Sequence, residues 1–375
     1  MRIGILSDVA GPYSDAGGIG MRIAAELAVE EFGGTVLGRP IEIHQVDHQN
    51  KSDIAASQAR NMIENLQVDV LTDGGASSSA LAIQSISREK EKIFLITSPG
   101  TTEFTGAQCS SFGFHFSYDT FALAKCTGSA VMQQPDSRGW YFITVDYAFG
   151  HSMERDATRF VKAGGGKVLG SVRPPLNTSD FSSFLLQASS SAPDVIGLAV
   201  VGQDLQNCIK QAQEFGITRG RTRLACFLMF VTDVIALGQN AASGLLLTES
   251  FYWDMTDQTR EWSNRFMARK PKPPTMPQAG NYSAVRHWLK AVDAAGTTEA
   301  RAVAAKMRQI SVDDMYNRDV RIREDGRVLH DMHLFEVKPP GESSGKFDLY
   351  RHLATTTGEY AYRPLDEGHC PLINN

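Results

Sequence analysis

Three loops rich in hydroxyl groups and glycine have residue types suited to binding an anion. They read GPYSDAGG at 11–18, GGASSSAL at 74–81 and SPGTT at 98–102, and each follows a short apolar run. Backbone N–H groups at a helix N-terminus attract anions, and serine and threonine hydroxyls add donors. An ordinary serine N-cap is the alternative for the second loop. The candidates for holding a carboxylate or a phosphate are Tyr13, Ser14, Asp15, Ser77, Ser78, Ser79, Ser98, Thr101 and Thr102.

Aromatic and methionine side chains follow a second group of apolar runs. DYAFG at 146–150, VGQD at 201–204 and CFLMF at 226–230 stand at or near the ends of expected strands. Such side chains at the mouth of a site suit the apolar body of a ligand. Residues 227–230 equally suit a buried central strand, because such strands are continuous apolar runs. The candidates in this group are Tyr147, Phe149, Gln203, Asp204, Phe227 and Met229.

Motifs of enzymes and of cofactor sites are missing from the sequence. Gly18-x-Gly20 lacks the third glycine of a dinucleotide fingerprint, and GGGK at 164–167 precedes an expected strand rather than a helix. We interpret GGGK as a helix C-cap and turn. No GxSxG, HExxH or CxxC occurs, and the nine histidines show no metal-ligand spacing. We therefore expect no catalytic residue, no metal and no cofactor.

The composition is that of an ordinary globular protein. The chain has 375 residues, of which 42% are hydrophobic and 21% charged, and its net charge is −5. This length favours two or three domains, and the acidic balance provides no basic field for nucleic acid. The opening residues MRIGILSD do not read as a leader, so we expect either a cytoplasmic protein or a mature chain whose leader was removed.

The five cysteines fall into two groups. Cys126, Cys208 and Cys226 have apolar neighbours and are expected to be buried. Cys109 and Cys370 lie in polar, loop-like stretches. A bridge between them would tie down the C-terminal tail and needs an oxidising compartment, so the residues alone leave the pairing open.

Short apolar runs alternate with helical patterns along most of the chain, which predicts an α/β fold of doubly wound parallel sheets. Ligands bind such sheets at the carboxyl ends of the strands, which gathers each group of loops at one edge. The alternation of strands and helices is interrupted at 112–121 and then resumes, which indicates two successive sets of strands and helices. Extended segments near 118, 250 and 330 are able to connect two lobes. The expected strands are 2–7, 41–46, 68–72, 93–97, 140–145, 167–172, 195–201 and 223–230. The expected helices include one capped by Ser52 and those over 204–215, 281–295 and 299–309. The proline-rich stretch 270–278 is expected to be a surface loop.

The sequence resembles the periplasmic solute-binding proteins of ABC importers, in the class that binds leucine, isoleucine and valine. The resemblance spans residues 2 to about 370 and rests on IGILSDVAGPYSDAGG, GRPIEIHQVDHQNKSDIA, the SSS loop, ITSPGTT, DYAFGHSMERD, NTSDFSSFLLQA, IKQAQEFGI and RIREDGR. It implies two α/β lobes joined by three crossovers, 1–119 with 251–329 and 120–250 with 330–375, with the ligand held between them. It also implies a periplasmic monomer, its leader removed, that delivers a small carboxylate to a membrane permease.

In the branched-chain amino acid binders of this family, the first lobe grips the ligand carboxylate through positions that match Ser77, Ser78, Ser98, Thr101 and Thr102. The second lobe uses a tyrosine that matches Tyr147 or Phe149. It also uses an acidic residue, for the ligand ammonium, in the loop after 223–229. Here that loop has no carboxylate before Asp233. This departure argues against an α-amino acid ligand.

The segments VDHQNK, DYAFG and GHCPL resemble a subgroup that binds aromatic acids such as benzoate or hydroxycinnamate derivatives. This resemblance implies a disulfide between Cys109 and Cys370. It also implies a ligand ring that packs against Tyr147, Phe149, Phe227 and Met229. A distal phenolic hydroxyl would need Asp204, Gln203 or Asp15. Two alternatives stay open: an amino acid ligand with Asp204 or Asp146 on its ammonium, and an intracellular ligand sensor of the same fold.

Overall fold

Two compact units make up the chain in the computed structural model, which describes residues 1–373. Unit 1 contains Met1–Tyr118, Phe251–His330 and the tail from Arg363 on, and unit 2 contains Asp119–Ser250 and Asp331–Tyr362. The chain therefore passes from one unit to the other four times. Three crossovers were predicted, with the whole segment 330–375 in the second lobe. That prediction was wrong for the tail, because its contacts are with unit 1.

Unit 1 is built on a five-stranded parallel sheet. Its strands are β1 (Arg2–Ser7), β4 (Glu42–Asp47), β5 (Val70–Asp73), β6 (Ile93–Ile96) and β7 (Gly113–His115), in the order β4-β1-β5-β6-β7. β1 pairs with β4 and β5, so that Ile3 lies opposite Ile43 on one side and Val70 on the other. Every residue of β5 and β6 is buried, as expected for central strands covered on both faces. A short hairpin of β2 (Thr35–Val36) and β3 (Arg39–Pro40) also belongs to this unit.

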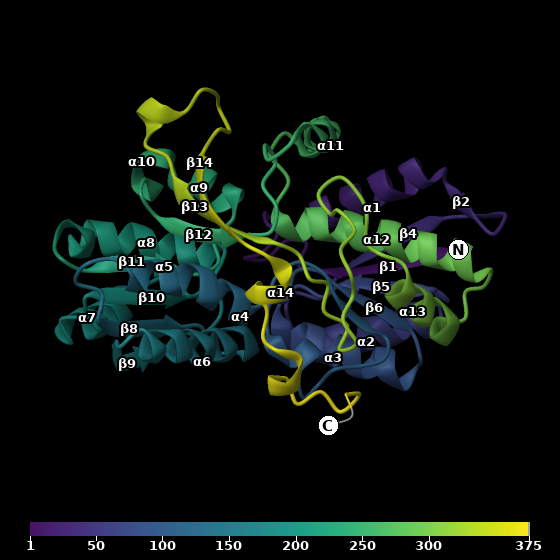
Figure 1. Cartoon of the computed structure of the whole chain (residues 1–375), viewed down its shortest axis with the longest axis horizontal. Helices are drawn as coiled ribbons and strands as arrows, with labels where there is room; N and C mark the ends of the chain where they lie inside the picture. The colour runs from purple at the N-terminus through teal and green to yellow at the C-terminus, as the bar shows by residue number, and fades with distance from the viewer. Residues whose placement is uncertain (374–375) are drawn as a thin grey trace. The chain divides into compact units, whose positions relative to one another are not determined.

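Helices cover both faces of this sheet (Figure 1). α1 (Ile19–Phe32) and α12 (Met276–Ala295) pack together on one face, and α2 (Ser52–Glu64) and α3 (Ser77–Glu89) pack together on the other. α11 (Asp257–Met267) and α13 (Ala300–Gln309) belong to the same unit. The face covered by α2 and α3 contains a core cluster of Leu6, Ala55, Ala59, Met62, Val68, Leu71, Ala80, Ile83, Ile86, Phe94, Ile96 and Phe104.

Two helix starts in unit 1 differ from the sequence-based expectations. α12 begins at Met276, inside the stretch expected to be a loop, with Pro277 in its first turn. Proline is tolerated there because the first N–H groups of a helix have no intrahelical acceptor. Ser52 was expected to cap α2, but it is the first helical residue, and Lys51 is the N-cap.

Unit 2 contains a four-stranded parallel sheet and a three-stranded antiparallel sheet. The parallel sheet is made of β8 (Gly139–Thr144), β9 (Lys167–Val172), β10 (Val195–Ala199) and β11 (Arg223–Cys226), in the order β11-β10-β8-β9. The antiparallel sheet is made of β12 (Leu246–Glu249), β13 (Met332–Val337) and β14 (Tyr350–Thr356), with β13 in the middle. The strand expected over 223–230 is shorter than predicted, because Phe230 is already the N-cap of α9 (Val231–Leu237).

Three longer helices connect the parallel strands of unit 2. They are α6 (Ala148–Ala163), α7 (Ser182–Ser190) and α8 (Gln203–Glu214). α7 packs beside α8, whereas α6 packs beside α4 (Thr120–Leu123) and the π-helical turn Ala124–Gly128 that precedes α5 (Ser129–Met132). Gly164 is the C-cap of α6, as predicted for GGGK. α10 (Gln239–Ala242) and α14 (Gly358–Ala361) are single turns. Within residues 1–373, no helix has the length and apolarity that a membrane crossing needs.

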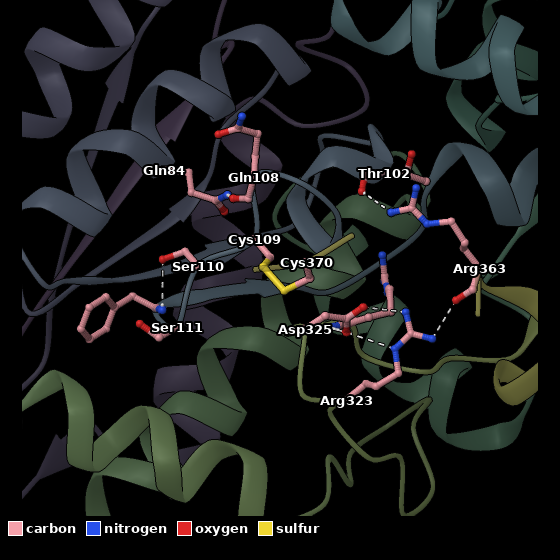
Figure 2. Close-up of a disulfide and its surroundings, with 12 residues drawn as sticks. Gln84, Thr102, Gln108, Cys109, Ser110, Ser111, Arg323, Asp325, Arg363 and Cys370 are labelled. Carbon is pink, nitrogen blue, oxygen red and sulfur yellow. Dashed lines mark hydrogen bonds and ion pairs between the residues drawn. A yellow bond between two sulfur atoms is a disulfide. The ribbon is translucent and has the colours of Figure 1, made fainter. Parts of the chain in front are cut away.

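The C-terminal tail is fixed to unit 1 (Figure 2). Cys370 forms a disulfide with Cys109, which lies 261 residues earlier in the chain. The guanidinium group of Arg363 donates to the carbonyl oxygen of Thr102 at 3.1 Å, and Arg323 donates to the carbonyl oxygen of Arg363 at 2.8 Å. These contacts explain why the tail belongs to unit 1. The other three cysteines are buried and free, as predicted: Cys126, Cys208 and Cys226.

Candidate functional site

The three hydroxyl-rich loops leave the same edge of the parallel sheet in unit 1. β1, β5 and β6 are neighbours in that sheet, and residues 8–18, 74–76 and 97–101 follow their carboxyl ends. This is the edge at which open α/β sheets bind ligands. The structure therefore gathers the first group of predicted residues in one region of unit 1.

The turn from β5 into α3 contains three successive residues with positive φ: Asp73 at 81°, Gly74 at 109° and Gly75 at 57°. Glycine suits the second position, since a Cβ on Gly74 would lie 2.7 Å from the Cβ of Ala80. α3 then starts at Ser77, and its N-cap Ala76 supplies no side-chain hydrogen bond. The positive end of the helix dipole is therefore left without a capping oxygen, which favours an anion there.

Ser77 joins this loop to the loop after β6. Its Oγ accepts the backbone N–H of Gly100 at 3.3 Å and that of Thr101 at 3.2 Å, and Ser77 is 1% exposed. The hydroxyl oxygen of Ser77 is thus used within unit 1. Ser78, the next residue, is half-buried. Ser79 is buried, and its hydroxyl has no hydrogen-bond partner within residues 1–373.

The loop after β6 ends in a short 3-10 helix, η1 (Thr102–Thr105). Thr101 is the N-cap of this helix, and its side chain accepts the backbone N–H of Glu103 at 3.4 Å. Thr101 and the first residue of η1 are fully buried, whereas Ser98 is half-buried. Ser78 and Ser98 therefore carry the most accessible hydroxyl groups of these two loops.

Asp8 organises the loop after β1. Its carboxylate is buried and accepts the backbone N–H groups of Gly11 at 2.7 Å and Tyr13 at 2.8 Å. Tyr13 and Ser14, both predicted site residues, are half-buried. Asp8 was not among the predicted site residues, although an aspartate directly after a buried strand is a recognisable signal.

Asp15 has a partner that weakens its predicted role as the acceptor of a phenolic hydroxyl. Its carboxylate oxygens lie 3.0 and 3.1 Å from the Nζ atom of Lys272. The carboxylate is therefore already engaged in an ion pair with the segment that precedes α12. Asp15 holds this segment against the loop after β1, and the side-chain amide of Gln278, which donates to the carbonyl oxygen of Gly17 at 3.0 Å, does the same.

Three further polar residues at this edge of the sheet, the buried Asp73 and His48 and the half-buried Asn50, were not among the predicted site residues. Asp73 accepts the hydroxyl of Ser7 at 2.6 Å, and burial raises the pKa of Asp73. His48 is fully buried, and the loss of hydration lowers its pKa. Asn50 donates its side-chain amide to Asp8 at 2.7 Å. The available signal was that each of these residues lies at or just after the end of an expected strand.

In unit 2, Tyr147 and Phe149 lie where β8 passes into α6. Tyr147 is the N-cap of α6 and makes no capping side-chain hydrogen bond. It is half-buried, Phe149 is buried, and their ring centroids are 6.3 Å apart. Asp146 is exposed, and its carboxylate lies 2.8 Å from Nε2 of His151. Asp146 therefore has a hydrogen-bonding partner on the surface, which weakens its alternative role on a ligand ammonium.

Asp204 is the buried carboxylate at the start of α8. It is 2% exposed, and its Oδ2 accepts the backbone N–H of Asn177 at 3.1 Å. Burial raises the pKa of Asp204 to about 6. Its other oxygen, Oδ1, is buried without a hydrogen-bond partner in the part of the chain that the structure describes. Gln203, the neighbouring predicted residue, is exposed.

Phe227 belongs to the core of unit 2. It is fully buried and stacks on Trp140 and Phe142, with ring centroids 6.2 and 6.3 Å apart. This burial fits the alternative of a buried apolar run, and the predicted contact of Phe227 with a ligand ring stays a prediction. Met229 is also fully buried.

Asp233 is the first carboxylate after β11, and both of its oxygens are used. Oδ2 accepts the backbone N–H of Phe230 at 2.8 Å, which caps α9, and Oδ1 accepts the side-chain amide of Gln206 at 2.8 Å. Asp233 is 2% exposed. Its position and its bonds make it a structural residue of the α9 start.

Comparison with known proteins identifies the family. The model of the family described as periplasmic binding protein matches residues 1–346. The chain belongs to the periplasmic binding protein family. The family and the α/β fold predicted from the sequence are thereby confirmed.

Solved structures agree with this assignment. A periplasmic binding protein from Burkholderia mallei is 45% identical, with a TM-score of 0.97 over 100% of this chain and 99% of that one. A branched chain amino acid ABC transporter periplasmic ligand-binding protein from Burkholderia xenovorans LB400 is 35% identical, with a TM-score of 0.85 over 99% of each chain. A solute binding protein of an ABC transporter from Rhodopseudomonas palustris BisB5, in complex with 3,4-dihydroxy benzoic acid, is 19% identical, with a TM-score of 0.85 over 96% and 97% of the chains, and shows the shared fold. No curated protein matches the sequence.

As a periplasmic binding protein of the ABC transporter type, the chain is assigned to small-molecule binding outside the cytoplasm, with a permease as its partner. The strand-end loops of each unit are then the natural positions for the binding residues. In unit 1 the accessible candidates are Tyr13, Ser14, Ser78 and Ser98, and in unit 2 they are Tyr147 and Gln203, with Asp204 buried but incompletely bonded.

Proposed function

We propose that this periplasmic binding protein captures a small carboxylate, most specifically an aromatic acid such as a benzoate or hydroxycinnamate derivative, for delivery to its permease. The main observation in support is that the backbone N–H groups of Gly100 and Thr101 both donate to the hydroxyl oxygen of Ser77. It holds two hydroxyl-bearing loops side by side at the edge of the unit 1 sheet, where a carboxylate can meet several donors at once.

The carboxylate end of the ligand is assigned to unit 1. Ser78, the second residue of α3, and Ser98 are half-buried, and the N-cap of α3 supplies no side-chain hydrogen bond. The hydroxyl of Ser98 also bonds to the carboxylate of Asp73. A hydrogen bond to a charged group contributes about 1.5–3 kcal/mol, and a helix N-terminus adds a favourable field. Donors of this kind suit an ionised carboxylate without needing a nearby lysine or arginine.

The ring of the ligand is assigned to unit 2. Tyr147 is half-buried at the start of α6, and Phe149 lies beside it. Oδ1 of Asp204, which has no hydrogen-bond partner among residues 1–373, is an acceptor for a phenolic hydroxyl. The loop after β11 has no carboxylate before Asp233, and Asp233 itself accepts the N–H of Phe230 and the side-chain amide of Gln206 at the start of α9. These features favour an aromatic acid over an α-amino acid.

Ligand capture is proposed to involve both units. Unit 1 would bind the carboxylate first, and closure about the connecting segments would then bring the residues of unit 2 to the ring. No covalent chemistry is part of this proposal, so the bound acid is released unchanged. Small-angle scattering should show a smaller radius of gyration when the ligand is added.

A branched-chain amino acid is the second candidate ligand. The buried oxygen of Asp204 that lacks a partner could accept an ammonium group as well as a phenol. The 35% identical relative is described as a branched chain amino acid ABC transporter protein, which supports including such ligands.

A thermal-shift screen separates the two candidates. A ligand at a hundred times its Kd stabilises the native state by about 2.7 kcal/mol, which should raise Tm by about 3–4 °C for a chain of this length. We expect this shift with 4-hydroxybenzoate or 3,4-dihydroxybenzoate and no shift with leucine. A shift with leucine alone contradicts the proposal for an aromatic acid.

A further inference from the structure

We infer that Asn50 is a positioning residue for the ligand site: its side-chain amide holds the loop after β1 and the loop after β5 in one arrangement. The inference rests on the proposed function, in which these loops carry ligand contacts. Asn50 itself lies in the turn after β4, outside all three loops, and nothing in the sequence pattern marks it as a ligand contact.

The two ends of the Asn50 amide bind two different loops. Oδ1 accepts the backbone N–H of Ala76 at 3.1 Å, and Nδ2 donates to Oδ2 of Asp8 at 2.7 Å. Ala76 is the N-cap of α3 and directly precedes the serine run. Asp8 in turn fixes the backbone N–H groups of Gly11 and Tyr13. One side chain thus connects the start of α3 to the turn that carries Tyr13.

The backbone of the turn holds Asn50 in place. Gln49 and Asn50 both have positive φ, at 56° and 54°, a conformation that asparagine tolerates better than most residues. The backbone N–H of Asn50 donates to Nδ1 of His48 at 3.0 Å, and that of His48 donates to the carbonyl of Ser7 at 3.1 Å. A Cβ on Gly75 would lie 2.5 Å from the ring of His48, so this turn is in direct contact with the loop after β5.

The connection extends to the third loop. Ser77 follows Ala76 directly, and its hydroxyl oxygen accepts the N–H groups of Gly100 and Thr101. A shift of Ala76 would therefore move the acceptor on which the loop after β6 depends. Through Asp8, Asn50 and Ser77, side chains join all three candidate loops of unit 1.

The chemistry of the site requires an amide at position 50. One end must accept from an N–H and the other must donate to a carboxylate, and alanine does neither. Asn50→Asp keeps the acceptor for Ala76 but places a second carboxylate against Asp8. Two adjacent carboxylates cannot both ionise readily, so a shared proton would restore the bridge at low pH. The charged or titratable groups near this bridge are Asp8 from the β1 loop, Asp47 from the end of β4, Asp73 from β5 and His48 from the turn itself.

Hydrogen exchange on the ligand-free protein tests the positioning role without any ligand. Asn50→Ala should accelerate exchange at Gly11, Tyr13 and Ala76 by tenfold or more, with unchanged exchange in β8 and β10 of unit 2. Asn65→Ala, the same change at an exposed position, is the control and should leave these amides protected. If Asn50→Ala leaves either loop as protected as in the wild type, Asn50 does not connect them and the inference is overturned.

Binding of 4-hydroxybenzoate tests the consequence for the site. The Kd of Asn50→Asp relative to the wild type should rise at least tenfold between pH 5 and pH 8, whereas the relative Kd of Asn65→Asp stays constant. A flat ratio contradicts the shared-proton bridge. If the wild-type protein binds no 4-hydroxybenzoate, the proposed ligand is wrong, and the exchange experiment alone decides the role of Asn50.

Discussion

The hydroxyl oxygen of Ser77 accepts the backbone N–H of Thr101 at 3.2 Å, although 24 residues separate them in the chain. Ser77 opens α3 after β5, and Thr101 caps the short helix after β6. The bond therefore joins the ends of two neighbouring strands. It makes the serine run and the SPGTT loop of the sequence one connected surface rather than two independent loops.

Ser77 and Ser78 should respond differently to alanine. Ser77→Ala leaves two buried N–H groups without their acceptor and should lower the free energy of unfolding by about 1–3 kcal/mol. Ser78→Ala should change stability by less than about 0.5 kcal/mol but weaken carboxylate binding about tenfold or more, because Ser78 is the accessible hydroxyl. Urea unfolding and calorimetry measure the two effects. Equal losses of stability in both variants contradict the distinction.

Tyr147 and Phe227 form a second matched pair. Phe227→Leu should destabilise unit 2 by about 1–3 kcal/mol, because it removes a stacked core ring, and should leave the affinity of the folded protein unchanged. Tyr147→Leu should leave stability nearly unchanged and weaken binding of an aromatic acid. If the fully folded Phe227→Leu variant binds the aromatic acid more weakly than the wild type, Phe227 contacts the ligand and this prediction is wrong.

Asp204 should make stability fall with rising pH. Its pKa is raised from 3.8 to about 6 in the folded state, so the native protein retains a proton that the unfolded chain releases. Its contribution to stability therefore decreases between about pH 4 and pH 6, and the cost of the buried charge is complete above that range. Each pKa unit corresponds to about 1.4 kcal/mol. After a reduction for residual solvation, the ionisation of Asp204 should lower the free energy of unfolding by about 2 kcal/mol in total.

Asp204→Asn isolates this contribution. The amide keeps an oxygen for the N–H of Asn177 but cannot ionise, so the variant should be more stable than the wild type above pH 6 and similar to it near pH 4. The comparison between the two proteins is needed because burial lowers the pKa of His287 to about 4 and of His330 to about 3. Those histidines destabilise the native state as the pH falls, which is the opposite slope. Parallel stability curves for the two proteins contradict the assignment to Asp204.

The disulfide between Cys109 and Cys370 should stabilise unit 1. It closes a long loop and fixes the tail near η1, so its loss should cost about 2–5 kcal/mol. A reductant should lower the Tm of the wild type but not that of a Cys109→Ser, Cys370→Ser double variant. If the reductant leaves the wild-type Tm unchanged while free-thiol titration shows both sulfurs reduced, the disulfide does not stabilise the fold.

The sequence predicted the elements whose signal is local. Apolar runs such as RIGILS and IFLI became β1 and β6 because a strand covered on both faces needs continuous apolar side chains. The hydroxyl-rich loops were found because they follow these runs directly. At Phe227 the apolar run continues past the end of β11 into the core beside Trp140, so the run alone overestimates the length of the strand.

The remaining features depend on partners that are distant in the chain. Asn50 looks like an ordinary turn residue until Asp8 and Ala76 are seen on either side of its amide. Asp15 has the pattern of a free acceptor in the sequence, but in the structure it forms an ion pair with Lys272, which is distant in the chain. The tail was predicted to belong to the second lobe, whereas in the structure Arg363 donates to the carbonyl oxygen of Thr102 in unit 1. No local sequence pattern indicates this contact.

Calorimetric titration with 4-hydroxybenzoate and with leucine, at pH 7 and in the same buffer, tests the central claim most directly. We expect saturable one-to-one binding of the aromatic acid with a Kd of about 10 μM or tighter, which corresponds to about 7 kcal/mol. Leucine should bind at least about a hundredfold more weakly. Tight binding of leucine without measurable binding of benzoate or hydroxycinnamate derivatives would contradict the account and identify an amino acid ligand instead.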